Sequence, residues 1–183
     1  MTTNSISNYD VGPNDKFMFD TNVWILLFGP VAGAELKKQK QYSSLLREIS
    51  SRGASIYITS LIVSEYINTV LRLGFKQWKR EDKIGRINAD FKQDYRNTEH
   101  YKSTLEEAVA QINVILSCTI RRPDDFHRIN INSMLDKLNC NCDYNDAYIV
   151  KCCEQDHLTL VSNDHDFAAV DSGITLLTTW NSY

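Results

Sequence analysis

The sequence Lys16-Phe17-Met18-Phe19-Asp20 sets the fold class of this 183-residue chain. An apolar run this short, without polar alternation, is typical of a strand buried on both faces, and such strands occur in parallel sheets. The run ends abruptly at an acid, and sites in open α/β sheets form beyond the carboxyl ends of the strands. Asp20 is therefore predicted to lie at the functional edge of a sheet.

The remainder of the chain alternates between strand and helix patterns. Residues rich in β-formers predict strands at 55–59, 158–162 and 174–178. Apolar residues at helical spacing predict helices at 35–52, from residue 60, and at 76–97, 101–117, 129–138 and 143–155. The order of these elements favours an α/β fold with a central, mostly parallel sheet. We expect a flexible tail over residues 1–15 and a single domain over residues 16–183.

The composition is that of an ordinary globular protein. Hydrophobic residues make up 43% and charged residues 23%, so the chain can bury a sizeable core. Its 20 basic and 23 acidic residues give a net charge of −3, so a nucleic acid would have to bind through local patches. No apolar run approaches the ~18 residues of a membrane span, and residues 1–15 lack the Lys and Arg of a secretory signal. With five cysteines and no such signal, we expect a cytoplasmic protein with reduced thiols.

Acidic side chains recur where the predicted strands end. Asp164 and Asp166 follow the strand at 158–162. Glu65 lies in the second turn of the helix that leaves the strand at 55–59. Because the carboxyl ends of parallel strands share one edge of a sheet, we expect these acids to meet Asp20 there.

Asp146 lies on the apolar face of its predicted helix. Ile149, Val150 and Cys153 follow it by three, four and seven residues, which is the spacing of one helical stripe. A carboxylate on such a face must be paired, protonated or bound to a metal ion, because burial of a bare charge is costly. No Lys or Arg stands at a pairing offset inside this helix, and Asp143 is its expected cap rather than a ligand.

Carboxylates that converge in this way repel each other, which raises some of their pKa values. A divalent cation removes the repulsion, and oxygen ligands of this kind suit Mg²⁺ or Mn²⁺ better than zinc. Two such ions about 3.5–4 Å apart can orient a water and stabilise the leaving oxygen of a phosphodiester. The acids therefore predict metal-dependent hydrolysis of a nucleic acid without a side-chain nucleophile.

Four short motifs together resemble those of PIN-domain nucleases. They are Phe19-Asp20-Thr21-Asn22-Val23-Trp24, Ser64-Glu65, Asn145-Asp146-Ala147-Tyr148-Ile149 and Leu160-Val161-Ser162-Asn163-Asp164-His165-Asp166-Phe167. Their order, spacing and placement at strand ends carry the resemblance, which spans residues 16 to 178. It implies a three-layer α/β/α fold and Mg²⁺- or Mn²⁺-dependent endonucleolytic cleavage of RNA.

The resemblance also implies roles for individual residues. The acids that match the family's catalytic and metal-binding quartet are Asp20, Glu65, Asp146 and Asp164, and Asp166 matches a further acid often found in the last motif. Thr21 and Asn22 match polar residues that hold the first acid in place, and Asn163 is assigned a supporting role. Many bacterial members are toxins held inactive by an antitoxin protein, so an antitoxin is a candidate partner.

One segment departs from the compact toxin-type members of this family. Residues 74–123 are longer than the corresponding part of those members and hold the helices predicted at 76–97 and 101–117. This departure leaves other PIN subfamilies open. The same pair of helices is a candidate surface for a homodimer or another partner.

Several of these residues have simpler alternative interpretations. Asp20 could cap a helix, and Asp166 could be a structural turn residue rather than a ligand. The motifs Cys140-Asn141-Cys142 and Cys152-Cys153 lack the spacing of zinc hooks and favour ordinary thiols. Trp24 could stack on a base, although packing within its apolar run is favoured.

Clustered basic residues are candidate contacts to an RNA backbone. The main cluster lies along the helix predicted at 76–97 and comprises Lys76, Lys79, Arg80, Lys83 and Arg86. Further candidates are Lys37, Lys38 and Lys40, and the pair Arg121-Arg122. Acids interrupt the main cluster, so a solvated helix face is the competing interpretation. If RNA is the substrate, one of these clusters is expected to line the acidic cleft.

Two other functions compete with the nuclease. A phosphatase of the haloacid-dehalogenase kind also places an Asp after its first strand, but a second Asp normally follows two residues later, where this chain has Asn22. A non-catalytic PIN-like module that binds RNA or protein usually lacks one or more of the acids, and this chain keeps all of them. Both comparisons favour the ribonuclease.

Overall fold

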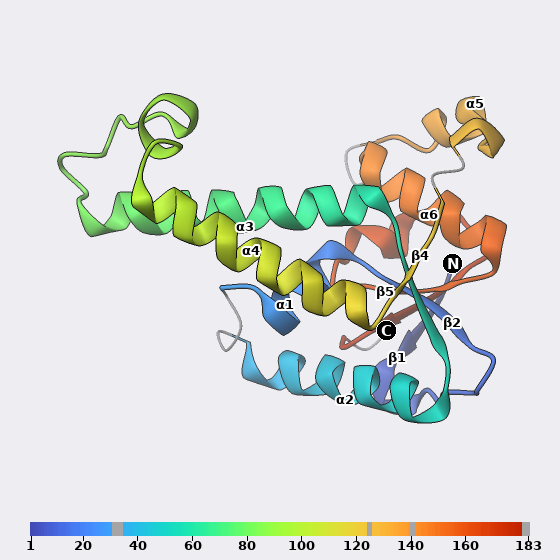
Figure 1. The fold of residues 1–183 in the computed structure, drawn as a ribbon. Coiled ribbons are helices and arrows are strands. Elements are labelled where there is room, and N and C mark those ends of the chain that lie inside the picture. The colour runs from blue at the N-terminus through green and yellow to red at the C-terminus, as the bar shows by residue number, and fades with distance from the viewer. Residues whose placement is uncertain (31–34, 124–125, 140–141, 181–183) are drawn as a thin grey trace.

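The computed structural model describes residues 1–30, 35–123, 126–139 and 142–180, which fold around one parallel sheet (Figure 1). The strands of this sheet are β1 (Thr2–Ser5), β2 (Lys16–Phe19), β3 (Ser55–Ile58), β4 (Ile120–Arg121), β5 (Thr159–Val161) and β6 (Thr175–Thr178). They lie in the order β1-β6-β5-β2-β3-β4, and every neighbouring pair is parallel. The predicted parallel sheet is confirmed.

β2 occupies the centre of the sheet, between β5 and β3. Phe17 lies in register with Ile56 on one side and with Thr159 on the other. The side chains of Phe17, Met18 and Phe19 are fully buried. Because both faces of this strand are covered, it has no solvent side, which explains the unbroken apolar run.

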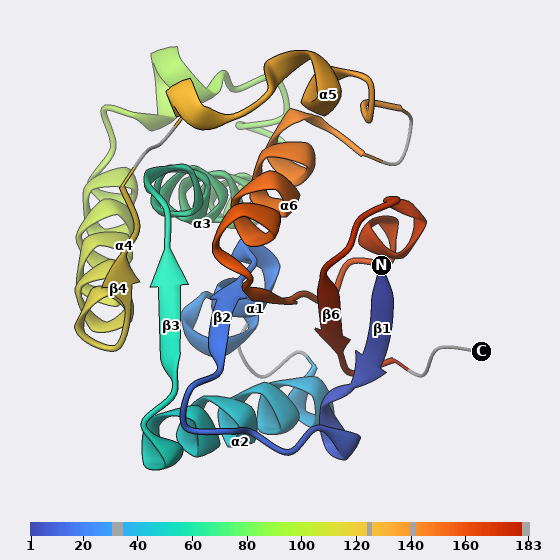
Figure 2. The ribbon, with the colours of Figure 1, turned by 90° about the vertical axis from the view of Figure 1, so that its right-hand side faces the viewer.

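Helices cover both faces of the sheet and give the three-layer α/β/α arrangement. The α-helices are α1 (Thr21–Phe28), α2 (Leu36–Arg52), α3 (Ser60–Glu81), α4 (Glu99–Ser117), α5 (Ile131–Leu135) and α6 (Tyr144–Asp156). Shorter helical turns are η1 (Ile6–Asn8), η2 (Phe91–Tyr95), η3 (Phe126–Arg128) and η4 (Asp166–Ala169). Figures 1 and 2 show α2 on one side of the sheet and α6 on the other. None of the helices within the described ranges has the length and apolar character needed to span a lipid bilayer.

Local sequence signals set where several helices begin and end. Gly53 ends α2 in the left-handed conformation (φ 75°), which glycine adopts without steric cost. The Thr59 hydroxyl caps α3 by accepting a hydrogen bond from the Ile62 amide (3.3 Å). Asp143 caps α6, as predicted, by accepting a hydrogen bond from the Asp146 amide (3.0 Å).

The N-terminal segment differs from the flexible tail expected from the sequence. Residues Thr2–Ser5 form the edge strand β1, which lies in register with β6 from Thr175 to Thr178. Ile6 and Val11, which follow it, are buried in the core. An edge strand is held by backbone hydrogen bonds to one neighbour, and this pairing does not require apolar side chains. The polar residues of β1 therefore show no hydrophobic strand pattern.

The segment between the two long helices also differs from the prediction. α3 continues without a break to Glu81, so a separate helix over 76–97 does not form. The side chains of Ile84 and Ile87 are 91% and 67% exposed, and residues 91–95 form a single π-helical turn. The helical spacing of the apolar residues in this segment therefore does not mark one helix face.

α3 and α4 pack against each other as a long hairpin that projects beyond the sheet (Figure 1). We refer to its far end, residues 74–104, as the arm. A Cβ atom on Gly74 would lie 2.7 Å from both the Tyr95 hydroxyl and Thr104 Cγ2, so the two sides of the arm meet closely at this glycine. Tyr95 is fully buried among the aromatic rings of the arm, which therefore has a small core of its own.

Candidate functional site

An acidic pocket of about 380 Å³ opens at the edge of the sheet where β2 and β5 end. Its walls come from the start of α1, from α3, from the start of α6 and from the segment after β5. The lining residues are Asp20, Thr21, Asn22, Glu65, Thr69, Asn139, Cys142, Asp143, Asp146, Asp164 and Asp166. Segments far apart in the sequence thus bring six carboxyl groups to one cavity.

Asp20 is a buried part of the pocket wall, between β2 and α1. Its backbone amide donates to the Val161 carbonyl (2.9 Å), which extends the pairing of β2 with β5 by one residue. Its carboxylate accepts hydrogen bonds from the Thr21 amide (2.6 Å), the Asn22 side-chain amide (2.6 Å) and the Ser162 hydroxyl (2.8 Å). Asp20 is also the N-cap of α1. Asp20 therefore both caps α1 and lines the pocket.

Glu65 reaches the pocket from the second turn of α3. The Thr21 hydroxyl donates to its carboxylate (3.0 Å), which ties α3 to the start of α1. Asn22 therefore holds Asp20, whereas the hydroxyl of Thr21 holds Glu65 rather than the first acid. The two polar residues after the first acid thus fix two different carboxylates.

Asp146 is half-buried in the first turn of α6. It forms a capping box with Asp143, in which the Asp143 amide donates to the Asp146 carboxylate (3.3 Å). Beyond it, α6 turns Ile149 and Val150 into the core. The helical face that carries Asp146 thus begins at the pocket and continues into the apolar interior, which explains an acid at the start of an apolar stripe.

The segment after β5 supplies the remaining acids. The Ser162 oxygen accepts a hydrogen bond from the Asp164 amide (3.0 Å), and the Asp164 carboxylate accepts one from the Asp166 amide (2.9 Å). The backbone amide of Asn163 donates to the Asn22 side chain (3.1 Å), so Asn163 supports the acids through Asn22. Asp164 and Asp166 are exposed and line the solvent side of the pocket.

The charges of the pocket are not balanced by neighbouring cations, since its described lining contains no Lys, Arg or His. Burial raises the pKa of Asp20 to about 7, against the opposing hydrogen bond from Ser162 and with the charge of Glu65 adding to the rise. Burial and the charge of Asp143 raise the pKa of Asp146 to about 6. Burial also raises the pKa of Glu65. A cation in this cavity would relieve the unfavourable charge.

The donor set of the pocket fits a divalent ion that prefers oxygen ligands. Within the described ranges, no group of three or more His, Cys, Asp and Glu side chains is arranged to hold a metal ion as it stands. The carboxylates of Asp20, Glu65 and Asp146 each accept a hydrogen bond from the protein itself.

The pocket unites all of the acids selected from the sequence, namely Asp20, Glu65, Asp146, Asp164 and Asp166. Ser162, which was not among the residues selected from the sequence, is fully buried and links Asp20 to the segment after β5. The available signal was a polar residue directly after a buried apolar strand. Thr69, Asn139 and Cys142 also line the pocket, and no sequence pattern marked them.

None of the clustered basic residues belongs to the described lining of the acidic pocket, contrary to the expectation that one cluster lines it. Residues 76–86 belong to the arm, where Lys79 and Arg86 each donate to a backbone carbonyl of the arm (2.7 Å). Arg122 is buried and forms an ion pair with Asp156. These cations are bound within their own part of the fold, so they are not directed toward the acids.

Other sequence candidates have structural roles. Trp24 is fully buried, and its ring packs on those of Phe19 (centroids 5.0 Å apart) and Phe28 (6.1 Å). Packing rather than base stacking is therefore confirmed for Trp24. Cys152 and Cys153 are buried in α6, whereas Cys140 and Asn141 lie outside the described residues.

Comparison with known proteins identifies the family of the chain and solved structures of similar fold. The family model of the PIN domain matches residues 17–173, a range that contains every acid of the pocket. No curated protein matches the chain. Among solved structures, a chain in the crystal structure of VapBC2 from Rickettsia felis, bound to a DNA fragment from its promoter, is similar with a TM-score of 0.54 and 14% sequence identity. The match covers 91% of this chain and 99% of that chain, and at this identity it shows the fold alone.

Proposed function

Since this chain belongs to the PIN domain family, we propose that it is a Mg²⁺- or Mn²⁺-dependent endoribonuclease whose reaction takes place in the acidic pocket. The observation that carries the proposal is the convergence of six carboxyl groups on a cavity whose described lining has no basic residue. Such a cavity is electrostatically unfavourable by itself, and a divalent cation relieves it.

We assign the metal site to the carboxylates of Asp20, Glu65, Asp146 and Asp164, with Asp166 as a further ligand on the solvent side. When bound, Mg²⁺ or Mn²⁺ supplies Lewis-acid stabilisation of charge on phosphodiester oxygens and a nucleophilic water at neutral pH. The task of the chain is to keep these carboxylates deprotonated and in place.

The hydrogen-bond network around the acids performs this positioning. Asn22 and Ser162 both bond to the same oxygen of Asp20, and the Thr21 amide bonds to the other. The Thr21 hydroxyl fixes Glu65 in the same way. Groups that orient metal ligands commonly change metal affinity or activity about 10–100-fold, so we assign Thr21, Asn22 and Ser162 as positioning residues.

The pocket also contains a thiol, which is poorly suited to attack a phosphodiester. Burial, together with the charges of Asp146 and Asp143, raises the pKa of Cys142. A cysteine reacts as its thiolate, and a raised pKa keeps the protonated form dominant. Water therefore remains the better nucleophile.

We further propose, on the basis of the family, that the protein acts in the cytoplasm and is restrained by an antitoxin. The fold that this chain shares with a chain of VapBC2 is consistent with such a partner. The projecting hairpin of α3 and α4 offers a surface for such a partner or for a second copy of the chain.

Incubation with total RNA in Mn²⁺, in Mg²⁺ and in EDTA tests the proposed activity. We expect fragments on a denaturing gel with either ion and intact RNA in EDTA. The Asp20→Asn protein, purified in parallel, should leave the RNA intact and so control for a contaminating nuclease. Cleavage in EDTA, or by Asp20→Asn at the wild-type rate, would overturn the proposal. RNA that is bound but never cut would instead identify a non-catalytic module.

A further inference from the structure

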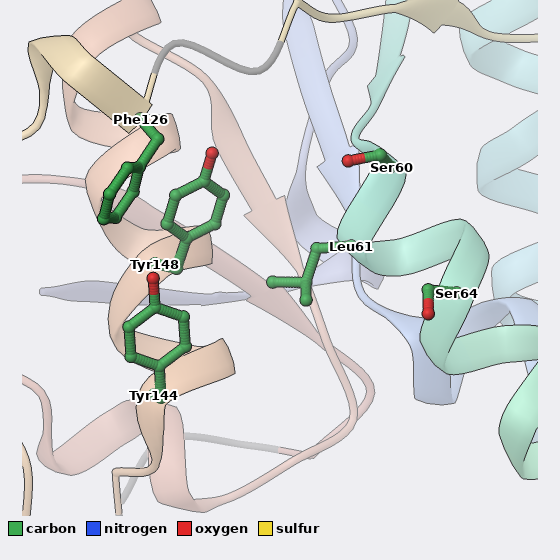
Figure 3. A pocket seen from close by; sticks show the side chains of 6 residues that line it. All are labelled: Ser60, Leu61, Ser64, Phe126, Tyr144 and Tyr148. Atoms are coloured by element: carbon green, nitrogen blue, oxygen red, sulfur yellow. The ribbon is translucent and has the colours of Figure 1, made fainter.

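A second hollow, of different character, lies beside the acidic pocket. Its volume is about 490 Å³, within the roughly 300–1,000 Å³ of small-ligand sites. One wall is aromatic and the other belongs to α3; the lining residues are Phe126, Tyr144, Tyr148, Ser60, Leu61 and Ser64 (Figure 3). In contrast to the acidic pocket, its described lining contains no ionisable carboxylate or cation.

The aromatic wall consists of three rings, of which those of Tyr144 and Phe126 are exposed and that of Tyr148 is buried. The rings of Tyr144 and Tyr148, one turn apart on α6, are inclined by only 15°, with centroids 6.3 Å apart. Phe126 lies next to Tyr148 at 6.4 Å and 33°. Of the aromatic residues that the structure describes, Tyr144 and Phe126 are the most exposed, at 42% and 48%. Exposed aromatic rings gathered on one wall in this way are typical of a binding surface.

The hollow and the acidic pocket share the same two helices. On α3, Leu61 lines the hollow, and Glu65, one turn further on, lines the acidic pocket. On α6, Tyr144 lines the hollow, and Asp146 lines the acidic pocket. One helical turn advances only about 5.4 Å, so a ligand held at the acids has its neighbouring part at the aromatic wall.

We propose that this hollow binds an unpaired base of the RNA whose adjacent phosphodiester lies at the acids, an inference that rests on the proposed function. Every base has a flat face that stacks on aromatic rings whatever its identity. Ser60 turns its hydroxyl toward the aromatic side chains, where it can bond to the edge of a stacked base (Figure 3).

The absence of cations from the described lining of both cavities strengthens this assignment. Neither cavity therefore offers a Lys or Arg of its described lining to the phosphates, and stacking on the aromatic wall is the contact that the hollow itself can make. A base within a duplex already has both faces covered by its neighbours. The hollow therefore selects single-stranded RNA.

Binding without cleavage tests the proposal, with Asp20→Asn protein in Mg²⁺ and the fluorescence anisotropy of a short labelled single-stranded RNA. We expect added Tyr144→Ala or Phe126→Ala changes to weaken binding about ten- to a hundredfold, the size of one lost stacking contact. Tyr144→Phe keeps the ring and should bind within about twofold. Val114→Ala, which removes a similarly exposed apolar side chain (50%) from α4, is the matched control and should have no effect.

Unchanged RNA affinity in both alanine variants would overturn base binding. The hollow would then be a binding site for an apolar segment of a partner protein. Equal affinity for the same sequence as a duplex would overturn base binding as well. The result is separable from the proposed activity. If the wild type cleaves RNA while both alanine variants bind normally, only the base site fails; if the variants lose binding but the wild type never cleaves, only the nuclease fails.

Discussion

The acidic pocket and the arm both concentrate charged residues, but the charges are paired in the arm and unpaired in the described lining of the pocket. In the pocket, Asp20 and Asp146 are held among other acids, and their pKa values are raised to about 7 and about 6. In the arm, Arg86 pairs with Glu81 (3.4 Å) and lies 4.2 Å from the centre of the Trp78 ring. The fold neutralises charge in the arm and leaves it unbalanced in the pocket.

This contrast shows that unbalanced charge marks a functional site better than the density of charge does. Lys76, Arg80 and Lys83 are exposed on the arm, where water solvates a cation at little cost. A buried carboxylate near other acids lowers stability instead, and such perturbed groups cluster at sites that bind or react. If the two regions differ in this way, changes in the pocket should affect activity and changes in the arm should not.

The strongest loss is expected when one charge is removed from the pocket. Asp146→Asn keeps the size of the side chain and an oxygen that can accept from the Asp143 amide. We expect the RNA cleavage rate to fall by at least about 10³-fold, as when one member of a cooperating catalytic group is removed. Asp143→Asn, the same change at the helix cap, is the matched control and should lose less than about tenfold. Equal rates for the two variants would contradict the assignment of Asp146.

A smaller loss of activity is expected from the hydroxyl that holds Asp20. Ser162→Ala removes the hydrogen bond of 2.8 Å, and we expect metal affinity or activity to fall about 10–100-fold. Because that bond lowers the pKa of Asp20, its loss should also shift the acid limb of the pH–rate profile to higher pH. Thr178→Val removes another buried hydroxyl as a control. A profile that does not move would show that Ser162 has only a packing role.

The pH dependence of stability should distinguish the pocket from the rest of the molecule. The pKa of Asp20 is about 7 in the folded protein and has its ordinary value of 3.8 when unfolded, so the folded state binds the proton more tightly. This contribution is full below about pH 4 and is lost as the pH rises through about 7. In EDTA, we expect wild type to lose on the order of 1–3 kcal/mol relative to Asp20→Asn between pH 5 and 8, with about 2–4 °C of Tm per kcal/mol. Parallel Tm curves for the two proteins would contradict this.

A substitution in the core of the arm should lower the stability of the protein and leave its activity unchanged. Gly74→Ala places a methyl group 2.7 Å from the Tyr95 hydroxyl and from Thr104 Cγ2, and Tyr95 is too deeply buried to move freely. Overpacking costs about 1–3 kcal/mol and the better helix propensity of Ala returns about 1 kcal/mol, so we expect a net loss of about 1 kcal/mol. Denaturant unfolding measures the loss. RNA cleavage at a permissive temperature should stay at the wild-type rate, and a variant as stable as wild type would show that the arm is not closely packed here.

The weakest effect is expected from the exposed cations of the arm. Lys76→Gln combined with Lys83→Gln removes two solvated charges that do not line the acidic pocket. We expect the cleavage rate and the RNA affinity to change less than about twofold, since exposed charges far from a ligand are screened by salt. A much larger loss at physiological salt would mean that RNA extends onto the arm.

Much of the site could be predicted because its signals are local. The apolar run before Asp20 lies within one strand, and the helical spacing after Asp146 lies within one helix. Each signal can therefore be read from a short stretch of sequence. Parallel topology then brings strand ends to one edge, so the position of Asp164 after β5 was sufficient to place it near Asp20. The parallel α/β class followed from the same strand and helix pattern, and the three-layer arrangement was implied by the resemblance to PIN domains.

The parts that could not be predicted depend on contacts between distant segments. β1 and the two-residue β4 are edge strands whose pairing partners, rather than their own patterns, define them. The periodic apolar residues near Ile84 resembled a helix face, but the arm folds onto its own aromatic core instead. The Thr21 hydroxyl binds Glu65, whereas Asn22 binds Asp20. This difference depends on the position of Glu65 on α3, and no local sequence signal gives that position.

Calorimetric titration of Mn²⁺ into the metal-free protein measures whether the unbalanced acids form a cation site. Wild type should bind Mn²⁺ with release of protons at pH values near the raised pKa of Asp20, while Asp20→Asn and Asp146→Asn should bind it far more weakly. Wild-type protein that takes up no Mn²⁺, or variants that take it up as tightly as wild type, would contradict the account.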